Sequence, residues 1–384
     1  MKGKATPPYR KKSNVFLAIR DIRFAKGRFA LMGSVVALIT LLLVLLSGLT
    51  AGLADQSTSA IARLGSGGTG TVDRIVFGGP AGAGAKASFT DSAVSADQVA
   101  LWRDQPGVEA AQAVGISQSR VQATGPDGEV TATANVAVFG VAPDGGLAPG
   151  PVTAGTAVLG SGVADDLSLS VGDPVTVGGM ELSVAAVVAD QWYSHTSVVW
   201  VDLPVWAALA HVSGPAQAGT VAAVTLGPAG ADEAAANAAA GTVSATRTGS
   251  FQALGSFRSE NGSLMLMQGF LYGISALVIV AFLTVWTIQR TRDIAVLKAL
   301  GAGSGYILRD AMAQAALVLV AGAAVGGGAG VVGGLLAGQA APFLITPATT
   351  LVPVLGITGL GLAGAALAVR RVAGVDPLLA LGGN

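Results

Sequence analysis

Residues 31–53 read LMGSVVALITLLLVLLSGLTAGL, an apolar run that predicts a membrane protein. No charged residue occurs between Arg28 and Asp55. A helix of this length, rising 1.5 Å per residue, crosses a hydrocarbon layer of about 30 Å. A cleaved signal peptide is the alternative, but the basic leader is too long and the apolar run exceeds the usual 7–15 or so residues. The run therefore predicts a first transmembrane helix over residues 31–54.

The composition also indicates a membrane protein. Hydrophobic residues fill 52% of the 384 positions and charged residues only 11%, whereas soluble domains carry about 25% charged residues. The chain has 55 glycines and few aromatic residues, which suits helices that pack backbone to backbone. It has no cysteine, which argues against disulfides, thiolate metal sites and a lipoprotein anchor.

Two more apolar regions predict three further transmembrane helices. One covers residues 261–289 and ends at the basic residue Arg290. The other, residues 311–369, contains no charged residue and is too long for a single span. Prolines at 342 and 347 interrupt it. We therefore expect helices at 310–338 and 350–369, joined by a short outer turn at 339–349.

The distribution of charge predicts the orientation of these helices. Three short segments, 1–30, 290–309 and 370–384, hold 15 of the 22 basic residues. Residues 55–260 hold 18 of the 22 acidic residues. Because short basic segments stay in the cytoplasm, both termini and the 290–309 loop are expected there, in a multi-pass protein of the cell membrane. Residues 55–260 are then expected outside the cell.

The outer region has the pattern of an α+β domain. Runs rich in β-branched residues predict strands, and polar or alanine-rich stretches between turn signals predict short helices. The expected strands lie at 72–77, 130–139, 174–177, 182–188 and 197–201, and the expected helices at 95–103, 163–167, 204–210 and 231–240. The expected fold class is an α-helical membrane protein of four transmembrane helices, with one extracellular α+β domain inserted between helices one and two.

Catalytic and metal sites are not expected. The pair Asp165-Asp166 fits a short surface helix, and His195, in an aromatic cluster before a strand, fits a packing or surface role better than ligation. The chain has two histidines and no cysteine, too few for a zinc site built from protein ligands alone. An intramembrane enzyme is also unexpected, because the predicted spans contain no histidine and no charged residue other than Asp310, at the very start of the third.

The segment after the second span carries the most specific motif, RTRDIAVLKALGA at residues 290–302. Ile294, Leu297 and Leu300 recur at three-residue spacing, which predicts an amphipathic helix, and Gly301 can supply its left-handed end. A basic helix on the membrane surface, or charge that only sets the topology, would give a similar pattern.

This motif resembles the intracellular coupling helix of the FtsX/MacB-like permeases (type VII ABC transporters), with Asp293 where glutamate is commoner. The segments 17–29 and 370–381 resemble the N-terminal amphipathic helix and C-terminal signature of that family. LGSGVA at 159–164 and VGDPV at 171–175 resemble its extracytoplasmic module. The resemblance covers essentially the whole chain.

The resemblance implies a homodimer bound to two copies of an ABC ATPase, which moves the helices and outer domains by mechanotransmission. ATP would be bound by that partner, since this chain has no G-x-x-x-x-G-K-[ST] motif and is not expected to be an enzyme or to bind nucleic acid. The residues implied in ATPase coupling are Arg290, Arg292, Asp293, Ile294, Leu297, Lys298, Leu300 and Gly301.

Glycines recur every four residues along the third span, at Gly322, Gly326, Gly330, Gly334 and Gly338. Such a stripe lets another helix approach closely. Packing within the chain is one interpretation, and a sliding or dimer face is the other.

The short outer domain and the string RFAL at 28–31 resemble the DevC/HrtB branch, whose HrtB members export haem. This implies that haem, as transported ligand and not as a permanent cofactor, enters from the bilayer and sits between the helices of two protomers near the outer surface. A haem-sensing two-component system in the same pathway would accompany it. The candidate contacts combine thioether, carboxylate, amide and phenol groups: Glu260, Asn261, Met265, Met267, Gln268 and Tyr272, with Asp55 and Gln56.

Two alternatives share the same membrane architecture. The chain could export another hydrophobic compound, such as a peptide, lipid or antibiotic. It could also be a signalling protein that switches an extracellular hydrolase or a sensor kinase.

Overall fold

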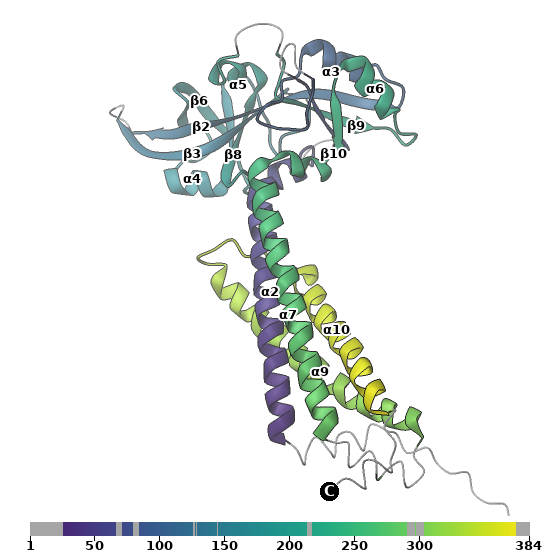
Figure 1. Ribbon diagram of the computed structural model, residues 1–384. Coiled ribbons are helices and arrows are strands. Elements are labelled where there is room, and N and C mark those ends of the chain that lie inside the picture. The colour runs from purple at the N-terminus through teal and green to yellow at the C-terminus, as the bar shows by residue number, and fades with distance from the viewer. Residues whose placement is uncertain are drawn as a thin grey trace, which may run out of the picture. The chain divides into compact units, whose positions relative to one another are not determined.

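The computed structural model describes residues 26–66, 71–79, 84–125, 127, 129–143, 145–212, 217–289, 296 and 303–373. The chain divides into two compact units. The first, called the helical unit, holds the described residues up to Gly52 and from Leu264 onward. The second, called the α+β unit, is Leu53–Ser263. The boundary between the units falls within two long helices (Figure 1).

Within the described residues, four helices are long and apolar enough to cross a membrane. They are α2 (Lys26–Ala62), α7 (Gly255–Gln289), α9 (Ser304–Ala337) and α10 (Pro347–Ala373). The expectation of four long apolar helices is therefore confirmed. Each is longer than the apolar run that predicted it, because polar residues at the ends continue the helical hydrogen bonding: α2 runs past residue 54 to Ala62.

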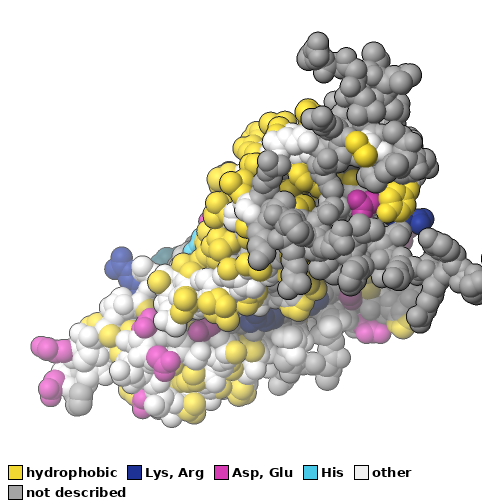
Figure 2. Space-filling model, turned by 90° about the horizontal axis from the view of Figure 1, so that it is seen from below, with side chains coloured by type: hydrophobic (Ala, Val, Ile, Leu, Met, Phe, Trp, Pro, Cys, Tyr) yellow, Lys and Arg dark blue, Asp and Glu magenta, His cyan; other side chains and the backbone are white. Residues whose placement is uncertain are grey.

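The helical unit has an aliphatic core with an apolar exterior. Buried side chains from all four helices meet in one cluster, which includes Leu43, Leu283, Leu319 and Ile357. Many large apolar side chains point outward instead, among them Leu277 of α7, which is 70% exposed. Figure 2 shows hydrophobic side chains over much of the described surface in that view. Such a surface is stable in lipid and costly in water.

The α+β unit contains one ten-stranded sheet with two parts, a closed ring and an open sheet. The longest strand, β2, belongs to both parts. β5 pairs back onto β2, so the strands β2, β3, β8, β4, β6 and β5 close into a ring. The other end of β2 pairs with β9, which continues through β1 to β10 as an open sheet. The strands are β1 (Arg74–Phe77), β2 (Val108–Thr124), β3 (Val130–Val141), β4 (Thr156–Gly160), β5 (Pro174–Val177), β6 (Met180–Val188), β7 (Trp192–Tyr193), β8 (Thr196–Asp202), β9 (Val221–Leu226) and β10 (Val243–Thr246).

Short helices cover the two parts of this sheet. α3 (Ala96–Arg103) and α6 (Glu233–Ala240) pack their buried side chains on the open sheet (Figure 1). α4 (Ser161–Leu167) and α5 (Leu203–Leu209) complete the core of the ring, and η1 (Gly249–Ala253) leads into α7. Ser95 begins α3 with a reciprocal capping box to Gln98. The α+β class predicted from the sequence is thus confirmed, although the sequence did not predict strands β2, β4, β7, β9 and β10.

A buried aromatic cluster ties both long helices to the sheet within the α+β unit. Phe77, Phe89, Tyr193, Phe139 and Trp200 form a chain of ring contacts with centroids 5.0–5.9 Å apart. The same core contains side chains from the last turns of α2 and the first turn of α7, namely Ala60, Ile61 and Phe257. The ends of the two helices are therefore part of the folded unit.

Candidate functional site

The turn between β7 and β8 reaches α2 through its backbone. Ser194 and His195 form a two-residue loop, and both have positive φ (49° and 65°), as in a type I′ hairpin turn. Their N–H groups donate to the carbonyl oxygens of Ser57 (3.1 Å) and Gln56 (3.0 Å) in α2. Two consecutive non-glycine residues in this conformation are strained, and these bonds help to hold them.

The side chains of the turn extend this connection to α7. His195 Nε2 lies 2.9 Å from Glu260 Oε2 and 3.1 Å from Ser57 Oγ. A carboxylate only accepts, so Nε2 carries the hydrogen and donates it toward Glu260. Ser194 Oγ lies 3.2 Å from Ser256 Oγ. We call this cluster the His195 joint: Gln56, Ser57, Ser194, His195, Ser256 and Glu260.

The joint does not have the geometry of a nucleophilic triad, although it contains serine, histidine and glutamate. In a triad the acid holds one imidazole nitrogen while the other accepts the serine proton. Here Ser57 and Glu260 both approach Nε2. The side chains of His195 and Glu260 are also about one-third exposed. The arrangement is suited to holding three segments together and not to acyl transfer.

Further polar contacts surround the joint. Arg63 pairs with Asp55 at 3.3 Å and donates to the backbone oxygen of Asp190 at 3.2 Å. Ser59 Oγ accepts from the N–H of Trp192 at 2.9 Å. The end of α2 is thus bonded along the strand that leads into the turn. Burial raises the pKa of the neighbouring Tyr193 phenol.

The predicted cargo residues divide between the two units. Asp55, Gln56, Glu260 and Asn261 belong to the α+β unit, where Gln56 and Glu260 meet at His195 and Asp55 pairs with Arg63. Sequence reasoning gave His195 only a packing or surface role. A two-residue turn at 194–195 could have been foreseen from the flanking strand residues, but its partner 65 residues further on could not.

The other four predicted cargo residues lie on α7 in the helical unit. Met265 is 61% exposed and Met267 51%. Residues two apart on a helix point about 200° apart, so these two thioethers face nearly opposite sides. Gln268 and Tyr272 are half-buried, and the Tyr272 ring lies over Gly356 of α10. Within one chain the two methionines therefore cannot contact the same side of a ligand.

Three glycines of the predicted stripe on α9 lie against α2. A Cβ at Gly326 would come within 2.1 Å of the Ala37 carbonyl oxygen, one at Gly322 within 2.8 Å of the Gly33 oxygen, and one at Gly330 within 2.8 Å of Val44. Further along the stripe, a Cβ at Gly334 would approach Ile345 and one at Gly338 would approach its own helix backbone. Close packing within the chain accounts for the first three.

Gly48 and Gly52 of α2 pack against the turn between α9 and α10. Leu344 donates its N–H to the Gly48 carbonyl oxygen at 3.0 Å, and a Cβ at Gly52 would come within 1.8 Å of the Pro342 oxygen.

Several predicted segments fall outside the described residues. The coupling residues Arg290, Arg292, Asp293, Ile294, Leu297, Lys298, Leu300 and Gly301 lie there, as do most of the N-terminal segment and the end of the tail. Across the part of the chain that is described, no group of three or more His, Cys, Asp or Glu residues is placed to hold a metal ion.

Comparison with known proteins matches both parts of the chain. Residues 30–242 match the family model of the MacB-like periplasmic core domain, and residues 249–377 match that of the FtsX-like permease C-terminal region. In three dimensions, the chain is similar to the periplasmic region of MacB from Actinobacillus actinomycetemcomitans, with a TM-score of 0.33 and 11% identity over 47% of this chain and 90% of that one.

Two relatives illustrate the range of the similarity. A hemin transport system permease protein named HrtB, from Staphylococcus epidermidis, is 27% identical over 216 residues, which is 55% of this chain and 59% of that protein. The chain therefore spans a little over half the length of this relative. An uncharacterised ABC transporter permease of Mycobacterium tuberculosis is 25% identical over 381 residues, or 96% of this chain and 99% of that one.

Proposed function

Because the chain belongs to the FtsX/MacB-like family of ABC transporter permeases, we propose that it is the membrane subunit of an ATP-driven efflux transporter that extrudes haem. The observation that carries the permease part of the proposal is the pair of family matches, which together cover residues 30–242 and 249–377. The four long apolar helices support the same conclusion, since they supply the spans that a permease needs.

In the proposed topology the α+β unit lies outside the cell and both termini lie in the cytoplasm. The support is the concentration of 15 of the 22 basic residues in the three short segments at 1–30, 290–309 and 370–384. The 290–302 segment would then face the ATPase partner. We propose two copies of that ATPase and two of this chain in the complex.

Mechanotransmission is the mode of action that best suits the α+β unit. The last turns of α2 and the first turn of α7 contribute to its buried core, and the His195 joint bonds both helices to the β7–β8 turn. A displacement of either helix end therefore changes contacts inside the unit. Cores packed at near-crystalline density transmit such strain instead of absorbing it.

Haem as cargo is supported by the name of the S. epidermidis relative and by the side chains at the start of α7. Met265 or Met267 could offer a thioether to iron, and Gln268 and Tyr272 could offer polar contacts. Glu260 is already paired with His195, so a ligand that used its carboxylate would have to displace the imidazole or use the second oxygen.

A second candidate cargo is another hydrophobic compound. The similarity that spans nearly the whole chain is to a permease whose name specifies no substrate, while the similarity to the hemin permease covers 55% of the chain. Both candidates use the same membrane architecture, so only binding and transport measurements separate them.

The test is a titration of the purified full chain in nanodiscs with haemin. The proposal predicts a saturable Soret band that Met265→Ala or Met267→Ala weakens, while Leu277→Ala, also exposed on α7, leaves it unchanged. Absence of a saturable band, together with normal haem tolerance of a deletion strain, would reject haem as cargo but leave the permease assignment intact.

A further inference from the structure

Residues 261–270 of α7 have few packing partners. Seven of these ten residues are exposed and the other three are half-buried, so none of them is buried. Because a helical turn takes 3.6 residues, the exposed positions cover all sides of the helix. This part of α7 is therefore held mainly by its own backbone hydrogen bonds.

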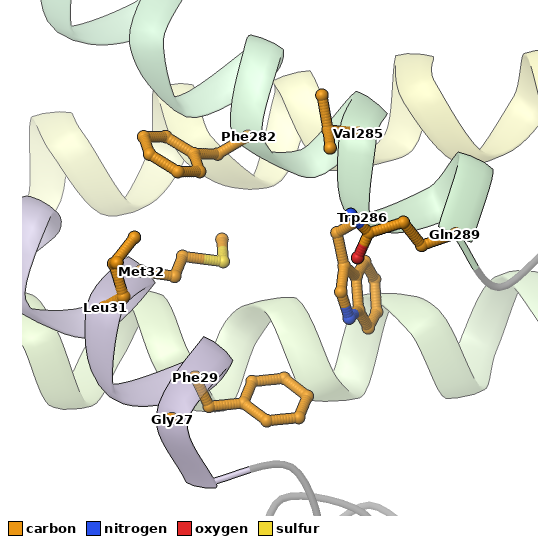
Figure 3. A pocket seen from close by; sticks show the side chains of 8 residues that line it. All are labelled: Gly27, Phe29, Leu31, Met32, Phe282, Val285, Trp286 and Gln289. Atoms are coloured by element: carbon orange, nitrogen blue, oxygen red, sulfur yellow. The ribbon is translucent and has the colours of Figure 1, made fainter.

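The parts of α7 on either side of this stretch are packed. Before it, Phe257 is buried in the core of the α+β unit. After it, Leu283 is buried together with side chains of the other three long helices. Trp286 stands edge to face with Phe29 of α2, with ring centroids 6.1 Å apart, beside a cavity of about 360 Å³ between the two helices (Figure 3). Residues 261–270 therefore connect two well-packed ends of one helix.

Three glycines in and next to this stretch have no packing role among the described residues. Gly262, Gly269 and Gly273 lie on one face of α7, because spacings of seven and eleven residues are close to whole turns. A Cβ added at any of them would meet no described atom within 4 Å, and none has positive φ. The first three glycines of the α9 stripe differ, since an added Cβ there would meet α2. Alanine favours a helix over glycine, so these three glycines weaken α7 without improving its packing.

The first of these glycines is followed by a serine that also weakens the helix. Ser263 Oγ donates to the backbone oxygen of Ser259 at 2.9 Å, four residues back. Serine side chains that bond in this way often bend helices, and sharp bends occur at Gly–Ser pairs such as Gly262-Ser263. The boundary between the two compact units falls directly after Ser263.

We infer that residues 261–270 form a hinge at which α7 bends, while α2 stays straight. The unit boundary in α2 falls directly after Gly52. Gly48 and Gly52 lie against the turn between α9 and α10, and Leu344 donates its N–H to the Gly48 oxygen. In α2 the helix is thus supported where it reaches the boundary, whereas in α7 it is not.

The hinge allows the part of α7 after Gly273 to move while Phe257 stays in the core of the α+β unit. Met265 and Met267 lie within the hinge, so bending changes the directions in which their thioethers point. The hinge itself rests on the structure of α7, and its role in transport rests on the function proposed above.

Distances between spin labels test the hinge in the full chain in nanodiscs. The chain has no cysteine, so only introduced cysteines are labelled. Ser259→Cys and Leu277→Cys flank the hinge at exposed positions, about 27 Å apart in a straight helix. Leu317→Cys and Leu335→Cys, also exposed, have the same separation on α9. Seven glycines lie between the α9 labels and three between the α7 labels, so glycine content alone would make α9 the more flexible helix.

The hinge predicts a distance distribution about twice as wide for the α7 pair as for the α9 pair. Replacing the three α7 glycines with alanine should narrow it to the α9 width, because alanine stiffens the helix and each methyl group fits. Gly255→Ala, on the same face of α7 but outside the hinge, should leave the width unchanged. Equal widths for the two pairs, or a width that the three alanines do not change, would overturn the hinge.

A second measurement tests the role of the hinge in transport. In proteoliposomes with the ABC ATPase, the triple alanine variant should still bind the ATPase but extract haemin at least about fivefold more slowly, since stiffening a hinge slows the motion it permits. Extraction at the wild-type rate by a variant whose distances have narrowed would overturn this role. Failure of the wild-type chain to extract haemin would instead count against the proposed cargo and leave the hinge to the distance measurement.

Discussion

His195 Nε2 lies 2.9 Å from Glu260 Oε2, and this contact joins the β7–β8 turn to the first turns of α7 across 65 residues of sequence. The same nitrogen lies 3.1 Å from Ser57 Oγ in α2. One imidazole therefore contacts both long helices where they enter the folded core of the α+β unit. In the mechanotransmission proposed above, this contact is a natural point for transmitting displacement.

The His195–Glu260 contact can be measured with a double-mutant cycle. His195→Ala and Glu260→Ala should each lower the stability of the full chain, and the double variant should lose less than the sum. The coupling should be about 0.5–1 kcal/mol, since both side chains are partly exposed. Thermal unfolding in detergent measures it. Strict additivity would show that the contact contributes nothing to the native state.

In the turn itself, one substitution is expected to stabilise the chain instead of destabilising it. Ser194 has φ of 49°, which costs roughly 1 kcal/mol for a residue with a side chain and nothing for glycine. Ser194→Gly should therefore stabilise the chain or leave it unchanged, although it removes the contact to Ser256. His195→Gly should destabilise it, because relief of strain does not replace the bonds to Ser57 and Glu260. The reverse order of melting temperatures would contradict this account of the turn.

Two glycines leave the space that the Trp206 side chain fills. Gly115 of β2 and Gly140 of β3 are direct cross-strand partners, and an added Cβ at either would lie within 2.3 Å of the Trp206 side chain. Gly140→Ala should destabilise the α+β unit by about 1–3 kcal/mol through overpacking. Gly255→Ala, where a Cβ meets nothing within 4 Å, is the control and should be neutral. Near-ultraviolet circular dichroism follows the loss of tryptophan packing, and equal melting temperatures of the two variants would refute the prediction.

The α9 stripe gives a similar comparison in the helical unit. Gly326→Ala places a methyl group 2.1 Å from the Ala37 carbonyl oxygen, whereas Gly328→Ala meets nothing within 4 Å. The first should lower thermal stability and transport, at a cost of about 1–3 kcal/mol. The second should be neutral or slightly stabilising, because alanine favours a helix over glycine. If both variants behave alike, the close approach of α9 and α2 is not required.

The ion pair between Arg74 and Glu233 predicts a dependence on pH. The two groups lie 2.7 Å apart, and the hydrogen bond from Arg74 lowers the pKa of Glu233 below its ordinary value of 4.5. The stabilisation is therefore present above pH 4.5 and is lost as pH falls through the lowered pKa. Glu233→Gln should remove this part of the acid destabilisation and cost about 1 kcal/mol at neutral pH. Glu129→Gln, on an exposed residue, is the control, and identical pH profiles for both variants would contradict the prediction.

The helices and the α+β class could be predicted because they depend on local patterns. A run such as residues 31–53 is apolar enough to require a helix in lipid, whatever the rest of the chain does. Strand β2 could not be predicted, because its Ala, Gln, Ser and Gly residues have low strand propensity. It is a strand because β3 and β9 pair along it.

The contacts of the site were less predictable, for a related reason. Gln56 and Glu260 could be placed at the exits of their helices from charge and hydropathy alone. Their common partner His195 could not be found, because it reaches them only through the tertiary position of a turn. Likewise the cavity beside Trp286 depends on the spacing of α2 and α7, which no pattern in either helix specifies.

The most direct test of the account is ATP-dependent movement of haemin by the reconstituted transporter. The full chain is incorporated into proteoliposomes with its ABC ATPase, and haemin extraction from the bilayer is followed by transfer to an acceptor protein. The account predicts extraction that requires ATP hydrolysis, that is lost with Leu297→Ala and Leu300→Ala in the coupling segment, and that is retained with the control Gly328→Ala. Stable binding of the ATPase without any ATP-dependent loss of haemin would contradict haem efflux, and failure of the ATPase to bind would contradict the permease assignment itself.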